Sequence, residues 1–188
     1  MKTLIIIPSR LSATRLPGKP LLKINGLSMI SHVFKKAEEA NIGEVVVAAE
    51  DQEIIDDVKK NGGQAILTKN HHNTGTDRIY EVVEKLNISN IDLVMNLQGD
   101  EPLINPKHID DVVKFHKKNF NYDIILPHLS LDHADNTNIV KIITNLKNEV
   151  IYLSRSKLPL EFKKRVKSYK KHLSIISFLP KALEKFNK

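Results

Sequence analysis

The chain has 188 residues, of which 41% are hydrophobic and 27% charged, a composition typical of a folded globular protein and too apolar for a disordered one. It contains no cysteine, which excludes disulfide bonds, zinc–thiolate sites and thiol nucleophiles. The net charge of +7 permits nucleic acid, a membrane surface or a phosphate-bearing substrate as partner, without distinguishing among them.

Predicted strands and helices alternate over the first 120 residues. Short apolar runs indicate buried strands, and apolar residues at helical spacing indicate amphipathic helices. In chain order we expect a strand at Leu4–Ile7, a helix at Ser28–Ala40, a strand at Glu44–Ala49, a helix at Asp51–Asn61, a strand at Gln64–Thr68, a helix at Thr76–Leu86, a strand at Ile91–Leu97 and a helix at Pro106–Phe120. This alternation predicts an α/β protein with a Rossmann-like, doubly wound sheet.

After residue 120 the pattern changes to strands with few helices between them, which predicts a mixed sheet. The expected strands are Asp123–Leu126, Ile139–Thr144, Val150–Leu153 and Leu173–Phe178, with a basic connector at Ser156–Lys171. We expect a single domain with an α/β half at 1–120 and a β-rich half at 121–188. Because no apolar run is long enough for a signal peptide or a membrane span, a cytoplasmic protein without a membrane partner is expected.

Ligands of open α/β sheets bind beyond the carboxyl ends of the strands, so the loops that follow strands are the places to search. The first loop, Pro8–Pro20, carries the cations Arg10, Arg15 and Lys19, which suit phosphate oxygens. Gly18 allows close backbone approach there, and three prolines stiffen the loop. The loop lacks the Walker pattern, and a solvated turn with scattered basic residues is the alternative.

The loop Leu97–Pro102 follows the strand at Ile91–Leu97 and contains Asp100. A carboxylate beside a phosphate-binding loop is suited to Mg²⁺, which takes one or two carboxylates together with substrate phosphates. A polar turn or a helix cap is the alternative.

A third loop, His71–Arg78, contains Gly75 between hydroxyl residues and is suited to a backbone wall against a flat base. Thr76 is placed to cap the next helix. His71 and His72 as metal ligands are a weaker interpretation, because adjacent histidines seldom face one site.

Together, PSRLSATRLPGKPL, HHNTGTDR and NLQGDEPLI, in this order and spacing, resemble the cytidylyltransferases that activate acidic sugars. The resemblance is strongest to the 3-deoxy-manno-octulosonate (KDO) cytidylyltransferases, or CMP-KDO synthetases. The segments LLKINGLSMISHV, GGQAILT, IVKII, IYLSR and KHLSI agree, so it covers nearly the whole chain. The resemblance implies a nucleotide-diphospho-sugar transferase fold that makes CMP-KDO and pyrophosphate from CTP and KDO, with Mg²⁺, for lipopolysaccharide synthesis.

The same resemblance implies roles for individual residues. Residues 1–120 would bind the nucleotide, and residues 121–188 would bind the sugar and form a homodimer. The implied nucleotide contacts are Pro8, Ser9, Arg10, Arg15, Lys19, Thr74, Gly75 and Gln98. Arg15, Lys19 and Asp100 would be catalytic, with Asp100 also holding Mg²⁺, and Arg78, Arg155 and His172 would bind KDO. The alternatives for the last three are a helix-face ion pair, a surface arginine and a loop histidine.

The sequence departs from the family pattern near its end. The pattern HLGIYGY reads HLSIISF at residues 172–178, so that Ile176 and Phe178 replace tyrosines. The family continues beyond Lys188, with further sheet and a second metal-binding aspartate, which predicts that part of the sheet is missing here. The alternatives are therefore a shortened member that retains only nucleotide binding, or a nucleic-acid-binding protein that uses Ser156–Lys171. Since no aromatic platform accompanies that basic run, no nucleic-acid partner is expected.

Overall fold

A computed structural model of the chain describes residues 2–12, 16–69, 72–86, 90–162 and 165–186. The chain forms two compact units. The larger unit combines Met1–Ile125 with Ile175–Lys188, and the smaller unit is Leu126–Ser174. The predicted division at residue 120 differs from this one because the segment from residue 175 onward returns to the larger unit.

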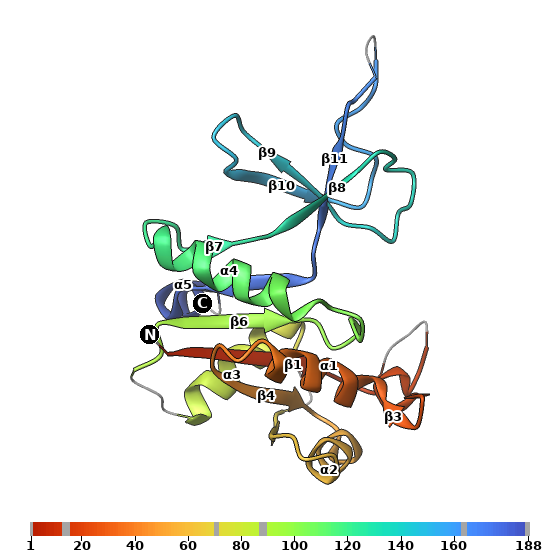
Figure 1. The fold of residues 1–188 in the computed structure, drawn as a ribbon, viewed down its shortest axis with the longest axis vertical. Helices are drawn as coiled ribbons and strands as arrows, with labels where there is room; N and C mark the ends of the chain where they lie inside the picture. Colours follow the sequence, from red (N-terminus) through yellow and green to blue (C-terminus); the bar gives the residue numbers. More distant parts are fainter. Residues whose placement is uncertain (1, 13–15, 70–71, 87–89, 163–164, 187–188) are drawn as a thin grey trace. The chain divides into compact units, whose positions relative to one another are not determined.

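The larger unit is built on a six-stranded sheet with the order β5-β4-β1-β6-β12-β7 (Figure 1). Its strands are β1 (Thr3–Ser9), β4 (Glu44–Ala49), β5 (Ala65–Leu67), β6 (Leu93–Leu97), β7 (Ile124–Ile125) and β12 (Ile175–Phe178). The first four strands in this order are parallel, and β12 is antiparallel to β6. The predicted doubly wound α/β fold with a mixed sheet is therefore confirmed.

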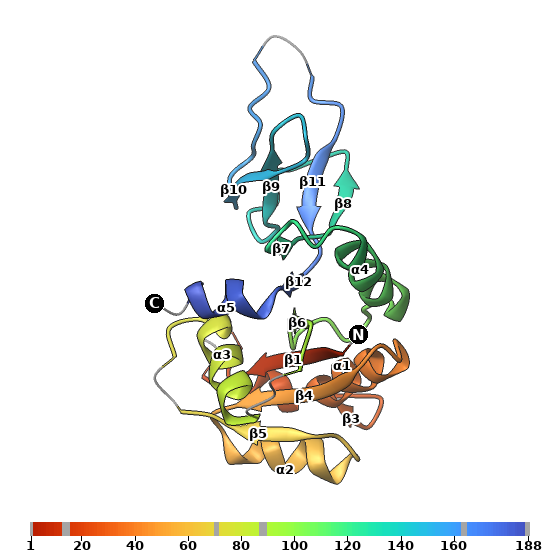
Figure 2. The same cartoon turned by 90° about the vertical axis from the view of Figure 1, so that its left-hand side faces the viewer.

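Helices cover both faces of this sheet. They are α1 (Met29–Glu39), α2 (Gln52–Lys60), α3 (Gly75–Leu86), α4 (Pro106–Lys118) and α5 (Pro180–Phe186). Figure 2 shows α3 and α5 on one side of the sheet and α1 and α4 on the other. On the α3 side, Ile79 of α3 and Leu183 of α5 pack in one buried cluster with Ile6, Val94 and Phe178 of the strands. The predicted cap of α1 is present, since Ser28 Oγ accepts a hydrogen bond from Ser31 N–H at 3.2 Å.

The turn after the first loop contains short elements that the periodicity did not predict. A 3₁₀ turn at Lys19–Leu21 leads into a hairpin of β2 (Lys23–Ile24) and β3 (Leu27–Ser28). Gly18 precedes the turn at φ +70°, in the left-handed region that glycine adopts without strain. Two-residue strands are too short to show a period, which explains why the sequence did not reveal them.

The smaller unit is an antiparallel sheet with the order β10-β9-β11-β8. Its strands are β8 (His128–Leu131), β9 (Lys141–Thr144), β10 (Val150–Ser154) and β11 (Tyr169–His172). The ammonium group of Lys141 is buried and donates to three backbone carbonyls, at 2.5 Å for Arg155. Three of the four residues of β11 fall in the predicted basic connector, because the sequence YKKH is too polar to indicate a strand and only its pairing with β8 and β9 defines it.

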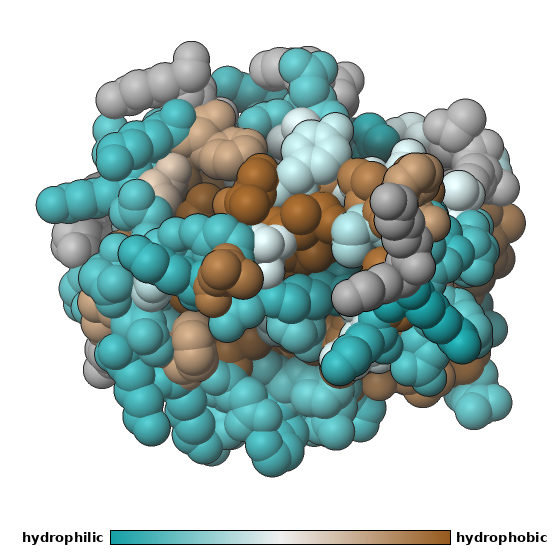
Figure 3. Space-filling view, turned by 90° about the horizontal axis from the view of Figure 1, so that it is seen from above, coloured by the Kyte–Doolittle hydropathy of each residue, from teal (hydrophilic) through white to brown (hydrophobic). Residues whose placement is uncertain are grey.

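Apolar side chains are exposed on the outer strand of the smaller unit. Val150, Ile151, Tyr152 and Leu153 of β10 are all exposed to solvent. In the space-filling view, apolar residues gather near the middle of one face and are surrounded by hydrophilic ones (Figure 3). No helix among the described residues is long and apolar enough to cross a membrane.

Candidate active site

A pocket of about 380 Å³ opens in the larger unit, lined by residues that follow the carboxyl ends of β1 and β6 and by the start of α3. All three loops selected from the sequence contribute to it. The predicted residues that line it are Pro8, Ser9, Arg10, Lys19, Thr74, Gly75, Arg78, Gln98 and Asp100. Parallel strands bring their carboxyl ends to one edge of the sheet, which is why loops up to 90 residues apart meet there.

Three predicted site residues are not among those that line this pocket. Arg15 lies outside the described residues, so the structure does not place it. Arg155 and His172 belong to the smaller unit. There, Arg155 donates to the carbonyl of Asn138 at 2.9 Å, and His172 is a buried residue of β11 rather than a loop histidine.

Lys19 and Asp100 bring together the cationic loop and the loop after β6. The Lys19 ammonium lies 2.8 Å from Asp100 Oδ2, and both side chains are partly exposed toward solvent. An ion pair this exposed contributes little to the free energy of unfolding. Its importance is geometric, because it brings a cation and a carboxylate from two distant loops together at one pocket.

Two glycines lie where the loops around the pocket pack closely. A Cβ atom added to Gly75 would lie 3.2 Å from Cγ of Pro8. One added to Gly99 would lie 3.0 Å from Ile30 Cδ1 and 3.1 Å from the carbonyl oxygen of Pro8. The backbone at Gly75 therefore lies close against Pro8, and the role of this loop as a wall beside a base stays a prediction.

Two acidic residues at the end of β4 anchor the cationic loop, and the sequence did not reveal them. Asp51 Oδ2 accepts from Leu11 N–H at 2.7 Å, and Glu50 Oε1 accepts from Ser12 Oγ at 3.3 Å. Asp51 occupies the cap position of α2, yet its side chain makes no hydrogen bond to that helix. A side-chain cap would stabilise the helix by about 1 kcal/mol. The Asp51 carboxylate instead holds the backbone of the cationic loop.

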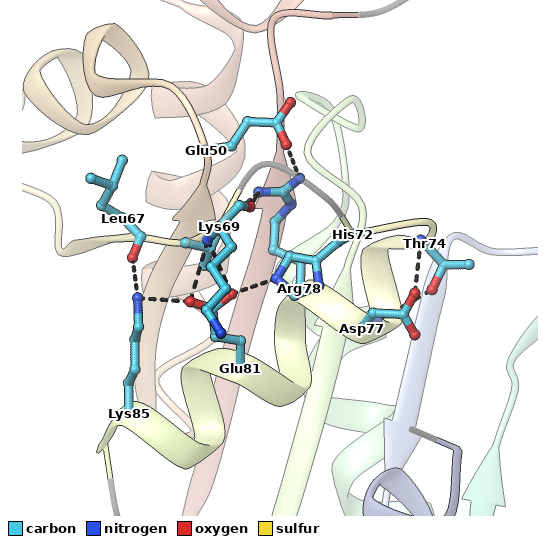
Figure 4. Close-up of polar contacts among 10 residues, drawn as sticks. Glu50, Leu67, Lys69, His72, Thr74, Asp77, Arg78, Glu81 and Lys85 are labelled. Atoms are coloured by element: carbon cyan, nitrogen blue, oxygen red, sulfur yellow. Dashed lines mark hydrogen bonds and ion pairs between the residues drawn. The ribbon is translucent and has the colours of Figure 1, made fainter. Parts of the chain in front are cut away.

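Arg78 is held by protein groups at the pocket wall (Figure 4). Its side chain is only 3% exposed and forms an ion pair with Glu50 Oε2. The guanidinium also donates to Thr68 Oγ1 at 2.5 Å and to the carbonyl of Lys69 at 3.2 Å. Arg78 is therefore ion-paired, but in a buried contact with the residue after β4 rather than in the helix-face pair given as the alternative, and its contact with a sugar carboxylate stays a prediction.

Glu81 on α3 anchors the backbone of Lys69, which precedes the loop His71–Arg78 at the pocket. Both carboxylate oxygens accept from Lys69 N–H, at 3.1 and 3.3 Å, and Lys85 Nζ lies 2.7 Å from Oε1. Nε2 of His72, which lines the pocket, is paired with Oε2 (Figure 4). Burial raises the pKa of Glu81, but the hydrogen bonds from Lys85, His72 and Lys69 outweigh it and hold the pKa at about 2.

This depressed pKa predicts a pH-dependent contribution of Glu81 to stability. The contribution is present above pH 4.5, the ordinary pKa of the group, and is lost as pH falls toward 2. We expect the free energy of unfolding to fall by on the order of 2–3 kcal/mol more in wild type than in Glu81→Gln across that range. Urea unfolding at several pH values measures it, with exposed Glu53→Gln as control. Parallel curves for wild type and Glu81→Gln would contradict the assignment.

The start of α3 corrects one prediction. The cap is Thr74 rather than Thr76: Thr74 Oγ1 accepts from Asp77 N–H at 3.2 Å, and Asp77 Oδ2 accepts from Thr74 N–H at 2.9 Å. Such a reciprocal pair satisfies two backbone donors at once. His72 is paired with Glu81, and His71 lies outside the described residues. Among the residues that the structure describes, no group of three or more His, Asp or Glu side chains could hold a metal ion.

Several lining residues were not predicted. Met29, Asn73 and Asn96 also face the pocket. Asn96 carried a visible signal, because it is the one polar residue in the otherwise apolar strand Leu93–Leu97. Ile176 of β12 lines the pocket too, at the position where the family pattern has a tyrosine.

Comparison with known proteins agrees with this arrangement. The family model described as "Cytidylyltransferase" matches residues 4–188. The 3-deoxy-manno-octulosonate cytidylyltransferase of Fusobacterium nucleatum is 41% identical over 95% of this chain and 73% of its own length. That of Escherichia coli is 36% identical over 99% of this chain and 76% of its own length.

A solved structure of a CMP:2-keto-3-deoxy-manno-octonic acid synthetase complexed with CTP superposes with a TM-score of 0.90. It is 34% identical and covers 99% of this chain and 77% of its own. The chain thus spans about three quarters of the length of these relatives. By sequence and by fold, the chain belongs to the cytidylyltransferase family, among the 3-deoxy-manno-octulosonate cytidylyltransferases.

Proposed function

We propose that this chain transfers CMP from CTP to the anomeric hydroxyl of KDO and releases pyrophosphate. The observation that carries the proposal is that the cationic loop, the loop with Thr74 and Gly75, and Asp100 all line one pocket. The relatives that match this chain are named for this activity, and the solved relative was complexed with CTP.

In this reaction the protein positions groups and neutralises charge. The anomeric hydroxyl gives up its proton to the surrounding water as its oxygen forms a bond to the α-phosphorus, the bond from that phosphorus to the bridging oxygen breaks, and pyrophosphate leaves with the electron pair. Arg10, Arg15 and Lys19 hold the triphosphate, and Lys19 and Arg15 stabilise the leaving charge. Pro8 and Gly75 flank the base, with Ser9, Thr74 and Gln98 completing the nucleotide site.

The donor set fits Mg²⁺. Asp100 offers a carboxylate that is half-exposed at the pocket, and hard cations of this kind take one or two carboxylates plus substrate phosphates. When bound, Mg²⁺ neutralises charge on the triphosphate oxygens. Lys19, paired with Asp100 at 2.8 Å, lies on the same side of the pocket and orients the same phosphates.

Within the larger unit, we assign Arg78 at the pocket wall as the cationic group that suits the carboxylate of the sugar acid. Arg78 is rigidly held at the pocket wall, so it offers a fixed positive charge rather than a mobile contact. Ile176 leaves an apolar surface beside the sugar where a tyrosine would offer a hydroxyl. The variant Ile176→Tyr tests the effect of this missing hydroxyl, and the quantity to measure is the KM for KDO.

The test of the proposal is pyrophosphate release from CTP and KDO, with CMP-KDO identified by mass spectrometry. ATP, GTP and UTP in place of CTP serve as controls. Release that requires both CTP and KDO is the expected result. Binding of CTP without any release would limit the function to nucleotide binding, and absence of CTP binding would overturn the proposal.

Asp100→Asn tests the metal site. We expect turnover to fall by about 10²-fold, because the replacement amide is neutral and a weaker ligand for Mg²⁺. Calorimetry should show that Mg²⁺ strengthens CTP binding to wild type but not to Asp100→Asn. The neighbouring Glu101→Gln, a change of equal charge outside the pocket lining, is the control. If Mg²⁺ strengthened CTP binding to Asp100→Asn as much as to wild type, Asp100 would not be the residue that binds the metal.

We further propose that the enzyme is a cytoplasmic homodimer that associates through the smaller unit. The support is the exposed apolar strand β10, since an outer strand with apolar side chains invites pairing with another chain. Sedimentation equilibrium of wild type and Ile151→Lys should show a dimer and a monomer, respectively. Dimers of equal stability would place the contact elsewhere.

A further inference from the structure

Asn96 is a buried polar residue in the floor of the pocket. It lies in β6 between the fully buried Met95 and Leu97, is 5% exposed, and lines the pocket. Its Oδ1 atom has no hydrogen-bond partner among the described residues. A buried polar group without a partner costs about 1–3 kcal/mol, so such groups need a physical reason.

The strands on either side of β6 leave this carboxamide without a polar neighbour in register. Because side chains alternate along a strand, Asn96 shares a face with Val94 and Gln98. The residues in register with it on the neighbouring strands are Ile6 of β1 and Ile176 of β12. Both of these neighbours are apolar. The remaining open direction is the pocket itself, which Ile176 and Gln98 also line.

A second pocket residue is in the same condition. Ser9, at the end of β1, is 8% exposed, and its Oγ has no partner among the residues described. By contrast, the buried Ser177 of β12, which does not line the pocket, has a partner: its Oγ lies 2.8 Å from Nδ1 of the buried His116. Two residues that line one pocket thus each carry an unpartnered polar atom, which is expected where a bound ligand supplies hydrogen bonds.

We propose that Asn96 is a further substrate-binding residue, whose carboxamide oxygen accepts a hydrogen bond from a donor group of a bound substrate. The donor is either a hydroxyl of the acceptor sugar or the exocyclic amino group of cytosine. This inference rests on the proposed function. It assigns part of the substrate specificity to the sheet floor rather than to the loops.

The decisive variant is Asn96→Leu, which keeps a similar volume and removes the polar atoms. Loss of an unpartnered buried group should leave the melting temperature of the free protein unchanged or raised. Binding of the substrate that supplies the donor should weaken by about 10-fold or more, since its donor then becomes unpaired. Calorimetry with CTP and the steady-state KM for KDO tell which substrate supplies it.

Thr3→Val is the matched control. Thr3 is also buried, at 3% exposure, and its Oγ1 also lacks a partner among the described residues, but it begins β1 and does not line this pocket. It should keep or raise the melting temperature and leave both substrate constants unchanged. Ser177→Ala should lower the melting temperature, because it removes the partner of buried His116.

The outcomes separate this inference from the proposed function. If wild type binds CTP and uses KDO while Asn96→Leu is equally active with both, a water molecule satisfies Asn96 and the inference is wrong. A lower melting temperature with unchanged substrate constants would show a purely structural role and would also overturn it. If wild type neither binds CTP nor releases pyrophosphate, the proposed function itself fails.

Discussion

Replacing Lys19 with alanine is expected to weaken CTP binding and to reduce turnover by about 10²–10³-fold. Lys19 supplies the one cation of the loop that the structure places beside Asp100, at 2.8 Å, and it lines the pocket. A point charge fixed beside the phosphates stabilises the negative charge that develops on the leaving pyrophosphate. Calorimetry with CTP and pyrophosphate release measure the two effects separately.

Lys23→Ala provides the control for charge alone. Lys23 is exposed on β2, four residues further along, and does not line the pocket. Because the net charge changes equally in both variants, long-range attraction of CTP is matched and only the local contact differs. Equal affinity of Lys19→Ala and Lys23→Ala for CTP would refute the assignment of the cationic loop.

Glu50→Ala is expected to lower the free energy of unfolding by about 3–5 kcal/mol, because it leaves the buried guanidinium of Arg78 without its counter-charge. Glu50 also accepts from Ser12 at 3.3 Å, so the same change removes one of the two contacts that hold the cationic loop to the end of β4, leaving that of Asp51. CTP binding by the folded fraction should therefore weaken as well. Urea unfolding followed by circular dichroism measures the stability, and calorimetry at low temperature measures the binding.

The double variant Glu50→Ala with Arg78→Met tests the cause. Removing both charges should recover much of the lost stability, since no buried charge then remains unpaired. Exposed Glu38→Ala should change the free energy of unfolding by less than about 0.5 kcal/mol. A double variant no more stable than Glu50→Ala would mean that packing, rather than charge, accounts for the loss.

Local patterns in the sequence were sufficient for the main elements of the larger unit. The apolar runs that became β1, β4 and β6 and the helical spacing of α1 to α4 are short-range signals, readable within about a dozen residues. The residue types in the loops also indicated their chemistry, since they include clustered cations, a glycine turn and an aspartate after a strand. Chain order and strand alternation then predicted that these loops share one edge of a parallel sheet.

Long-range pairing was beyond the reach of those patterns. β11 is too polar to indicate a strand, and β12 could not be assigned to the main sheet until its pairing with β6 was known. The pairing of β12 with β6 places the division between the two units elsewhere than at residue 120. The pairing of β11 with β8 shortens the basic connector. Such contacts depend on which surfaces meet, which no local period records.

At the site, residue types alone were enough to suggest a phosphate-binding loop beside a carboxylate suited to Mg²⁺, whereas the cytidylyltransferase function was implied by the resemblance of the three loops to a known family. The roles of Glu50, Asp51 and Asn96 needed the folded chain. A carboxylate after a strand looks the same whether it binds solvent, caps a helix or holds a loop 40 residues away, as Asp51 does. Burial and partnership are properties of the assembled core, and only the tertiary structure decides them.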